Sequence, residues 1–141
     1  MRAAMSRLDP WAPPLVLVAV IWFFSSQPDL SSGLGVIDLV GRKLIHAGEY
    51  ALLCFLCWRA LRARLADRAA LAVAFGLAVA YGAVDEYHQT FVAGRNGSPI
   101  DVGIDSLGAA LAVLAIRSRL GSRDSVPATE RSDRARERAS G

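Results

Sequence analysis

Four apolar blocks, separated by segments that hold most of the charge, constrain this chain more than any other feature. The blocks cover residues 11–25, 43–61, 69–84 and 102–116. A soluble helical domain of this size would alternate apolar and charged faces along each helix, whereas here the charges lie mainly between the blocks. Hydrophobic residues make up 53% of the chain even though residues 121–141 are almost entirely polar. The pattern predicts an all-α integral membrane protein, a four-helix bundle formed by residues 10–120.

The blocks are short for membrane spans. Each apolar core has roughly 15–18 residues, against the ~20 that a bilayer requires. The polar first turns must therefore belong to the spans, and their charges would lie at or just below the membrane interface. Small residues in the third and fourth blocks predict close contacts between helices: Gly76, Gly82, Gly103, Gly108, Ala109 and Ala112.

The arginines predict the orientation of the bundle. Arg2, Arg7, the connector 59–68 and the segment from Arg117 onward all fall on one side if there are four crossings. Basic residues favour the cytoplasmic side, so both chain ends are expected there. The linker 27–41 and the loop 85–101 then lie together on the extracytoplasmic side of a bacterial plasma membrane.

The candidate site residues gather at that extracytoplasmic end. Those of the second block follow steps of three and four, which place them along one stripe of a helix. An ionisable group at a membrane edge is costly enough to be read as functional. The candidate pocket consists of Lys43, His46, Glu49, Tyr50, Asp85, Glu86, His88, Gln89, Arg95, Ser98, Asp101 and Asp105.

Several roles remain open for the charged members of this set. Asp101, after Pro99, is placed to cap the fourth helix. Asp105 lies one turn deeper, where capping no longer explains it, and we expect it to bind Arg95, Lys43 or a ligand. The guanidinium of Arg95 suits either a phosphate or carboxylate ligand or an ion pair with Asp101 or Asp105.

The histidines suggest two further kinds of chemistry. If the third helix continues to Gln89, Asp85 and His88 face inward together, and Glu86 faces a neighbouring helix or the headgroups. Histidine with carboxylates is a possible divalent-metal set, and it would equally support acid–base catalysis. We expect no metal and no cofactor, because no His-x-x-x-His spacing is present and basic side chains can neutralise the acids.

Other segments have simpler interpretations. Cys54 and Cys57 lie one turn apart in an apolar run, so we expect free, buried thiols rather than redox or metal ligands. The first block is read as a helix, with a cleaved signal peptide as the alternative. The linker 27–41 is expected to contain a short amphipathic turn on the membrane surface, and residues 121–141 to form a disordered tail.

The polar string also resembles a known family. Lys43-x-x-His46-x-x-Glu49-Tyr50, followed by Tyr81-Gly82-x-x-Asp85-Glu86-x-His88-Gln89-x-Phe91-x-x-Gly94-Arg95-x-x-Ser98-x-x-Asp101-x-x-x-Asp105-x-x-Gly108, is similar to the VanZ-like membrane proteins. One departure is Ala93, where the family commonly has proline. The family's namesake is associated with low-level resistance to the glycopeptide teicoplanin. The resemblance therefore implies a small helical membrane protein acting on the cell envelope.

Three functions fit this reading. The first is a binding module for an envelope lipid headgroup, a lipid-linked precursor or a glycopeptide. The second is an enzyme that modifies such a headgroup, with His46 or His88 as base and Arg95 holding phosphate. The third is a structural network of ion pairs. A nucleic-acid surface is not indicated, because the basic residues flank the apolar blocks. A transporter is also disfavoured, since the ionisable groups gather at one end.

Overall fold

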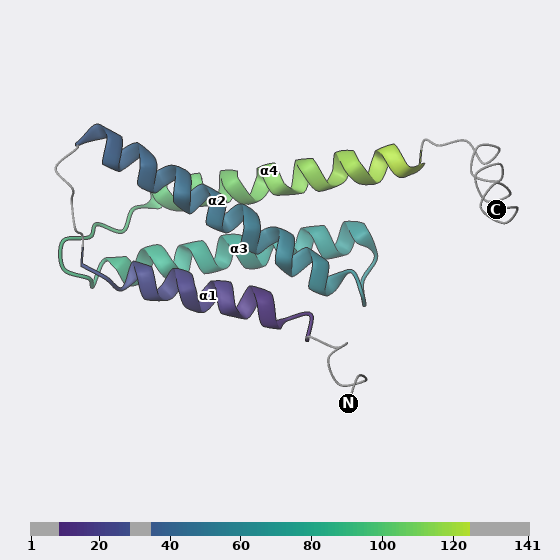
Figure 1. Ribbon diagram of the computed structural model, residues 1–141, viewed down its shortest axis with the longest axis horizontal. Helices are drawn as coiled ribbons and strands as arrows, with labels where there is room; N and C mark the ends of the chain where they lie inside the picture. The colour runs from purple at the N-terminus through teal and green to yellow at the C-terminus, as the bar shows by residue number, and fades with distance from the viewer. Residues whose placement is uncertain (1–8, 29–34, 125–141) are drawn as a thin grey trace, which may run out of the picture.

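The computed structural model describes residues 9–28 and 35–124, and these ranges contain four helices and no strand. The helices are α1 (Ala12–Ser25), α2 (Val36–Leu61), α3 (Asp67–Gln89) and α4 (Pro99–Asp124). They lie roughly lengthwise beside one another (Figure 1), with α2 in contact with all three others and α1 in contact with α2 and α3. The predicted all-α bundle is thereby confirmed.

Three of the helices are long enough to cross a membrane. The apolar stretches Leu39–Leu61, Asp67–Gln89 and Pro99–Gly121 each contain 23 residues, with mean hydropathies of 1.3, 1.5 and 1.7. The first helix has 14 residues, which at ~1.5 Å per residue reach only about two thirds of a ~30 Å hydrocarbon core. The described residues thus contain three helices of spanning length and one shorter apolar helix, and a crossing of the membrane by α1 stays a prediction.

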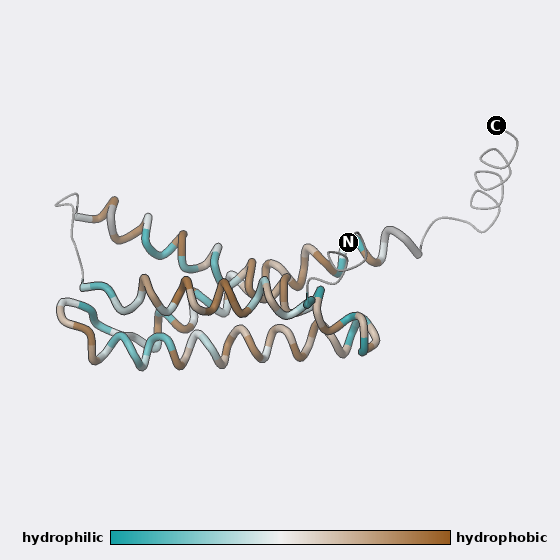
Figure 2. The backbone as a smooth tube through the Cα atoms, turned by 60° about the horizontal axis from the view of Figure 1, so that its bottom comes forward, coloured by the Kyte–Doolittle hydropathy of each residue, from teal (hydrophilic) through white to brown (hydrophobic). Residues whose placement is uncertain are grey.

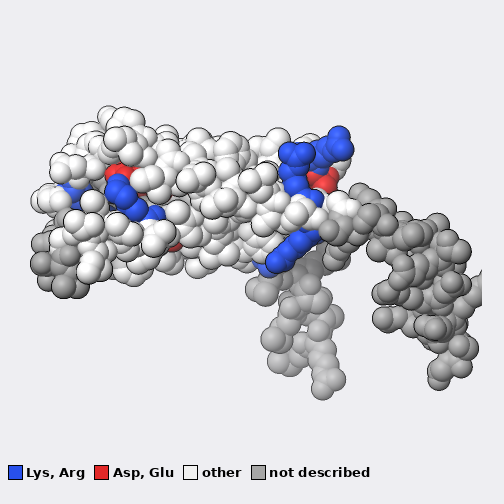
Figure 3. Space-filling model, turned by 90° about the horizontal axis from the view of Figure 1, so that it is seen from above, with Lys and Arg blue, Asp and Glu red and all other residues white. Residues whose placement is uncertain are grey.

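Charge and hydropathy are segregated along the helices. Figure 2 shows apolar residues concentrated in the middle of the bundle and hydrophilic residues nearer its ends. In the view of Figure 3 the Lys, Arg, Asp and Glu atoms appear at the two ends, with a broad uncharged surface between them. Many apolar side chains stay exposed on that surface, Leu15, Phe23 and Leu114 by 60% or more each. An exposed apolar band of this kind suits a lipid surrounding rather than water.

The helix connections place the polar segments at one end. The end of α1, the start of α2, the end of α3 and the start of α4 meet there, and the α2–α3 connector lies at the other end (Figure 1). A shared end for the linker 27–41 and the loop 85–101 was expected from the placement of the arginines. Which end faces the cytoplasm stays a prediction.

Two predicted boundaries are wrong. α2 begins at Val36, so the amphipathic turn expected within the linker belongs to the first turns of a long helix. α4 continues to Asp124, into the segment expected to be a disordered tail. The remaining part of that expected tail, residues 125–141, lies outside the described residues, as do 1–8 and 29–34.

The core is built from small and aromatic side chains. Tyr50, Cys54 and Ala78 are fully buried, and Cys54 and Cys57 are free thiols. A Cβ at Gly108 would overlap the backbone carbonyl of Ala47, so glycine is required where α4 crosses α2. Gly82 also lies in close contact, since a Cβ there would be 3.4 Å from the ring of Tyr50. Gly76 and Gly103 were expected to make such contacts too, but this is wrong: among the described residues, nothing beyond each glycine's own stretch of helix lies within 4 Å of a Cβ built there.

Candidate functional site

A cavity of about 210 Å³ lies among the polar ends of α2, α3 and α4 and the α3–α4 loop. Seven of the twelve predicted site residues line it: Lys43, His46, Glu86, Gln89, Arg95, Asp101 and Asp105. Arg42 and Asn96, which the sequence analysis did not single out, line it too. Of the remaining predicted residues, Glu49 lines an adjacent hollow together with His46 and Arg95.

One ion pair closes a side of this cavity. The ammonium of Lys43 on α2 donates a hydrogen bond to the carboxylate of Asp101 on α4. Both side chains are partly exposed, at 33% and 25%. Lys43 thus binds the more superficial of the two α4 carboxylates, and not Asp105.

Ser98, rather than Asp101, caps α4. The Ser98 hydroxyl accepts the backbone N–H of Ile100 at 3.1 Å, the usual bond of an N-cap serine. The backbone N–H of Ser98 in turn donates to Oε2 of Glu86 at 3.0 Å. The expectation that Asp101 provides the cap is wrong, because its carboxylate is bound to Lys43 instead.

Asp105 is the least satisfied group of the site. It is 1% exposed, and neither of its carboxylate oxygens has a hydrogen-bond partner among the described residues. The imidazole of His46 lies beside it, with 3.9 Å between Nδ1 and Oδ1. A charged carboxylate that is buried without partners costs several kcal/mol, so this group is either protonated or bound to a cation.

Asp85 is buried and held by α1. Its Oδ2 accepts the hydroxyl of Ser25 at 2.8 Å and the amide of Gln89 at 3.1 Å. Its Oδ1 has no partner in the described part of the chain. Sequence analysis missed Ser25; the available signal was a small polar residue that closes an apolar block at the same end as the candidate pocket.

Arg95 also binds α1. Gly94 has a φ of 76°, a left-handed conformation that glycine adopts without strain. After this turn, Nε of Arg95 donates to the carbonyl of Gln27 at 2.8 Å and Nη2 to that of Phe24 at 2.9 Å. The last carbonyls of a helix lack partners within it. Arg95 binds one of these, that of Phe24, and the carbonyl of Gln27 two residues past the end of α1. The ion pair expected with Asp101 or Asp105 is not among the contacts found for Arg95 in the described residues.

His88 does not join the carboxylates. Its ring stacks on the indole of Trp22 in α1, with 3.9 Å between the ring centroids and 25° between the planes. Asp85 also turns toward α1, so the two residues share a neighbour but not a common pocket. His46 is therefore the histidine of the carboxylate cluster.

Tyr50 lies beneath the cluster. It is fully buried, and its hydroxyl has no hydrogen-bond partner among the described residues. Its ring packs near that of Tyr81, with 6.2 Å between centroids. The Tyr81 hydroxyl donates to the carbonyl of Val18 at 2.8 Å, another bond that ties α1 to α3.

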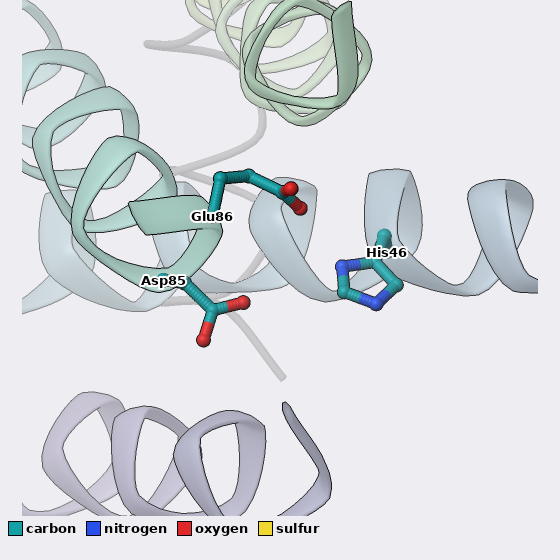
Figure 4. Close-up of side chains that lie close together, drawn as sticks. All are labelled: His46, Asp85 and Glu86. Atoms are coloured by element: carbon teal, nitrogen blue, oxygen red, sulfur yellow. The ribbon is translucent and has the colours of Figure 1, made fainter. Parts of the chain in front are cut away.

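The closest cluster of potential metal ligands joins two helices. His46 of α2 and Asp85 and Glu86 of α3 each offer a ligand atom within 4.8 Å of the others. Figure 4 shows the carboxylate of Glu86 and the imidazole of His46 on facing sides of the gap between α3 and α2, with Asp85 turned toward α1. Both carboxylates are buried, while His46 is partly exposed.

These features define a class of protein. The chain has three helices long and apolar enough to cross a membrane and one shorter apolar helix. With a set of ionisable groups at one end, these are the features of a small helical membrane protein. The chain belongs to the VanZ/LLP1 family, whose family model matches residues 11–120. No curated protein and no solved structure shows significant similarity to it. The predicted resemblance is thus confirmed.

Proposed function

We propose that this protein resides in the bacterial plasma membrane and binds the phosphate-bearing headgroup of an envelope lipid or lipid-linked precursor. The polar cavity would open at the extracytoplasmic face, as the arginine distribution predicts. The observation that carries the proposal is the mixed lining of this cavity: beside the acidic Glu86, Asp101 and Asp105 it contains three basic side chains and two amides, those of Arg42, Lys43, Arg95, Gln89 and Asn96. Such groups bind phosphate oxygens through charge-assisted and amide hydrogen bonds.

The size of the cavity favours a headgroup over a glycopeptide. A volume of about 210 Å³ is below the ~300–1,000 Å³ typical of sites for drug-sized ligands. A phosphate with part of its substituent fits that space, whereas a glycopeptide would place only one small group in it. A role in teicoplanin resistance would then act through the bound lipid-linked precursor.

The surface beside the cavity suits a ligand with a lipid tail. Val40 and Leu44 of α2 are 50% and 68% exposed, next to the cavity residues Lys43 and His46, and Ile100 of α4 is 74% exposed. An acyl or prenyl chain lying along these side chains would keep its headgroup at the cavity without leaving the bilayer.

The alternatives account for fewer of the observations. A purely structural network would pair its members, as Lys43 and Asp101 do, but Asp105 has no hydrogen-bond partner among the described residues. A headgroup-modifying enzyme would need a base beside the phosphate, yet His88, one of the two expected bases, stacks on Trp22 and does not line the cavity.

The test compares two probes that differ only in the headgroup. Purified full-length protein in nanodiscs would be titrated with a short-chain polyprenyl phosphate and with the matching polyprenyl alcohol, using native mass spectrometry. We expect the phosphate to bind at least tenfold more tightly, and Lys43→Ala to remove most of that preference. Arg64→Ala, which removes an exposed cation from the opposite connector, is the matched control.

Equal binding of the phosphate and the alcohol would refute the headgroup proposal. In cells, expression of the protein should raise the teicoplanin concentration needed to stop growth, and Lys43→Ala should cancel that increase. If Lys43→Ala raised that teicoplanin concentration as much as the wild type does, any resistance would not depend on this cavity.

A further inference from the structure

The cluster of His46, Asp85 and Glu86 has the composition of a metal site. Three side chains from two helices bring one nitrogen and two carboxylate oxygens within 4.8 Å of one another. In Figure 4 one oxygen of Asp85 turns toward α1 and the other toward the gap that the imidazole of His46 faces. The first of these oxygens is held by Ser25 and Gln89, while the second has no partner among the described residues.

Asp105 provides a second, independent observation. It comes from a third helix, is 1% exposed, and has two oxygens without a hydrogen-bond partner in the described ranges. The 3.9 Å from its Oδ1 to Nδ1 of His46 is too long for a hydrogen bond. Two ligands held ~2.1 Å from one metal ion lie about 3–3.5 Å apart, so this separation is close to that of ligands sharing an ion.

Two of the cationic side chains near the cluster have partners elsewhere. Lys43 is bound to Asp101, and the hydrogen bonds of Arg95 go to carbonyls of α1. The expectation that no metal is present assumed that these two side chains neutralise the deeper acids. Asp85, Glu86 and Asp105 instead share the neighbourhood of His46.

We propose that His46, Asp85, Glu86 and Asp105 form a site for one divalent transition-metal ion, with Zn²⁺ or Mn²⁺ as the fitting candidates. One imidazole with three carboxylates suits these ions, whereas Ca²⁺ takes six to eight oxygen ligands. This goes beyond the proposed headgroup binding, because the chain's own side chains would hold the ion whether or not a lipid enters. The ion would also tie α2, α3 and α4 together at one point.

The surrounding hydrogen bonds are suited to hold the ligands in place. The backbone N–H of Ser98 binds Oε2 of Glu86 at 3.0 Å, and Ser25 binds Oδ2 of Asp85 at 2.8 Å. The second oxygen of Asp85 then has no partner among the described residues, and the second oxygen of Glu86 has only a long contact of 3.4 Å from the amide of Gln89, so both are within reach of an ion. Such supporting partners orient metal ligands and strengthen binding.

The test measures the metal alone. Full-length protein in phosphatidylcholine nanodiscs, stripped with a chelator, would be titrated with Zn²⁺ against a chromogenic competitor and with Mn²⁺ by electron paramagnetic resonance. We expect one ion per chain, with at least tenfold weaker binding in Asp105→Asn and His46→Ala. Asp67→Asn makes the same chemical change at the opposite end, in a side chain 42% exposed, and should bind as the wild type does.

The absence of binding to folded wild-type protein would overturn the proposal, as would wild-type affinity in folded Asp105→Asn. Thermal unfolding and size-exclusion profiles establish folding for each variant. If Asp105→Asn does not fold, X-ray absorption spectroscopy of Zn²⁺ bound to the wild-type protein identifies the ligand atoms instead. Nitrogen and oxygen ligands including one imidazole would support the site, and sulfur ligands would assign the ion to Cys54 and Cys57.

The two proposals can fail separately. Metal binding without polyprenyl phosphate binding would refute the proposed function alone. Polyprenyl phosphate binding without metal binding would refute the metal site alone.

Discussion

Gly108 of α4 packs against the backbone of Ala47 of α2 so closely that a Cβ at residue 108 would overlap the Ala47 carbonyl. This contact sets the spacing of the site above it. His46 precedes Ala47 on α2, and Asp105 lies one turn before Gly108 on α4. The distance between the imidazole and the buried carboxylate therefore depends on how closely the two helices cross.

The first prediction concerns this crossing. Gly108→Ala should lower the free energy of unfolding by about 1–3 kcal/mol, the usual cost of overpacking, because the added methyl must push the helices apart. Thermal unfolding in detergent measures the effect. Gly103→Ala is the control in the same helix, where a Cβ meets open space, and it should leave stability unchanged or slightly raised. Equal stability of both variants would contradict the tight crossing.

The second prediction concerns the bond between α1 and the buried carboxylate. Ser25→Ala should destabilise the protein by about 1–3 kcal/mol, because Oδ2 of buried Asp85 loses its hydroxyl donor. Ser26→Ala is the matched control: its hydroxyl binds the Trp22 carbonyl at an exposed position, so a change of at most about 0.5 kcal/mol is expected. Chemical unfolding followed by tryptophan fluorescence compares the two. Similar losses would show that Ser25 does not anchor Asp85.

The third prediction concerns Arg95. Arg95→Lys should cost about 1–3 kcal/mol, because a lysine ammonium cannot reproduce the two-pronged contact with the carbonyls of Phe24 and Gln27. Hydrogen exchange in the segment that ends α1 should also become faster. Arg64→Lys, at an exposed position in the opposite connector, serves as the control and should change neither quantity. Unchanged exchange in Arg95→Lys would argue against the capping role.

The fourth prediction concerns orientation. Asn96→Cys should react with a membrane-impermeant maleimide in intact cells, because the basic residues at the other end predict that end to be cytoplasmic. Arg64→Cys should react only after permeabilisation. The native Cys54 and Cys57 are buried, so labelling of the wild-type protein gives the background signal to subtract. The reverse labelling pattern would place the cavity in the cytoplasm and refute the proposed extracytoplasmic site.

Much of the fold was predictable from local patterns. The apolar blocks indicated the helices, because burying backbone polar groups in an apolar surrounding requires helical hydrogen bonding. Their boundaries were less predictable: Val36 begins α2 within what looked like a linker, in a first turn where Val36 and Ile37 are more than 70% exposed. From their apolar neighbours Cys54 and Cys57 were expected to be free and buried, and they are.

By itself, the sequence determined that helices would form and that their polar ends would gather, because connection lengths and alternating crossings bring the linker and the loop to one end. Only the tertiary structure decided which groups pair. Arg95 binds a carbonyl at the end of α1, and Ser98 caps α4. Lys43 forms an ion pair with Asp101, so Asp105 lies beside His46 without a lysine partner. These choices depend on the rotation and closeness of the helices, which are fixed by contacts such as that of Gly108 with Ala47 and are not encoded in the spacing of residues along the chain.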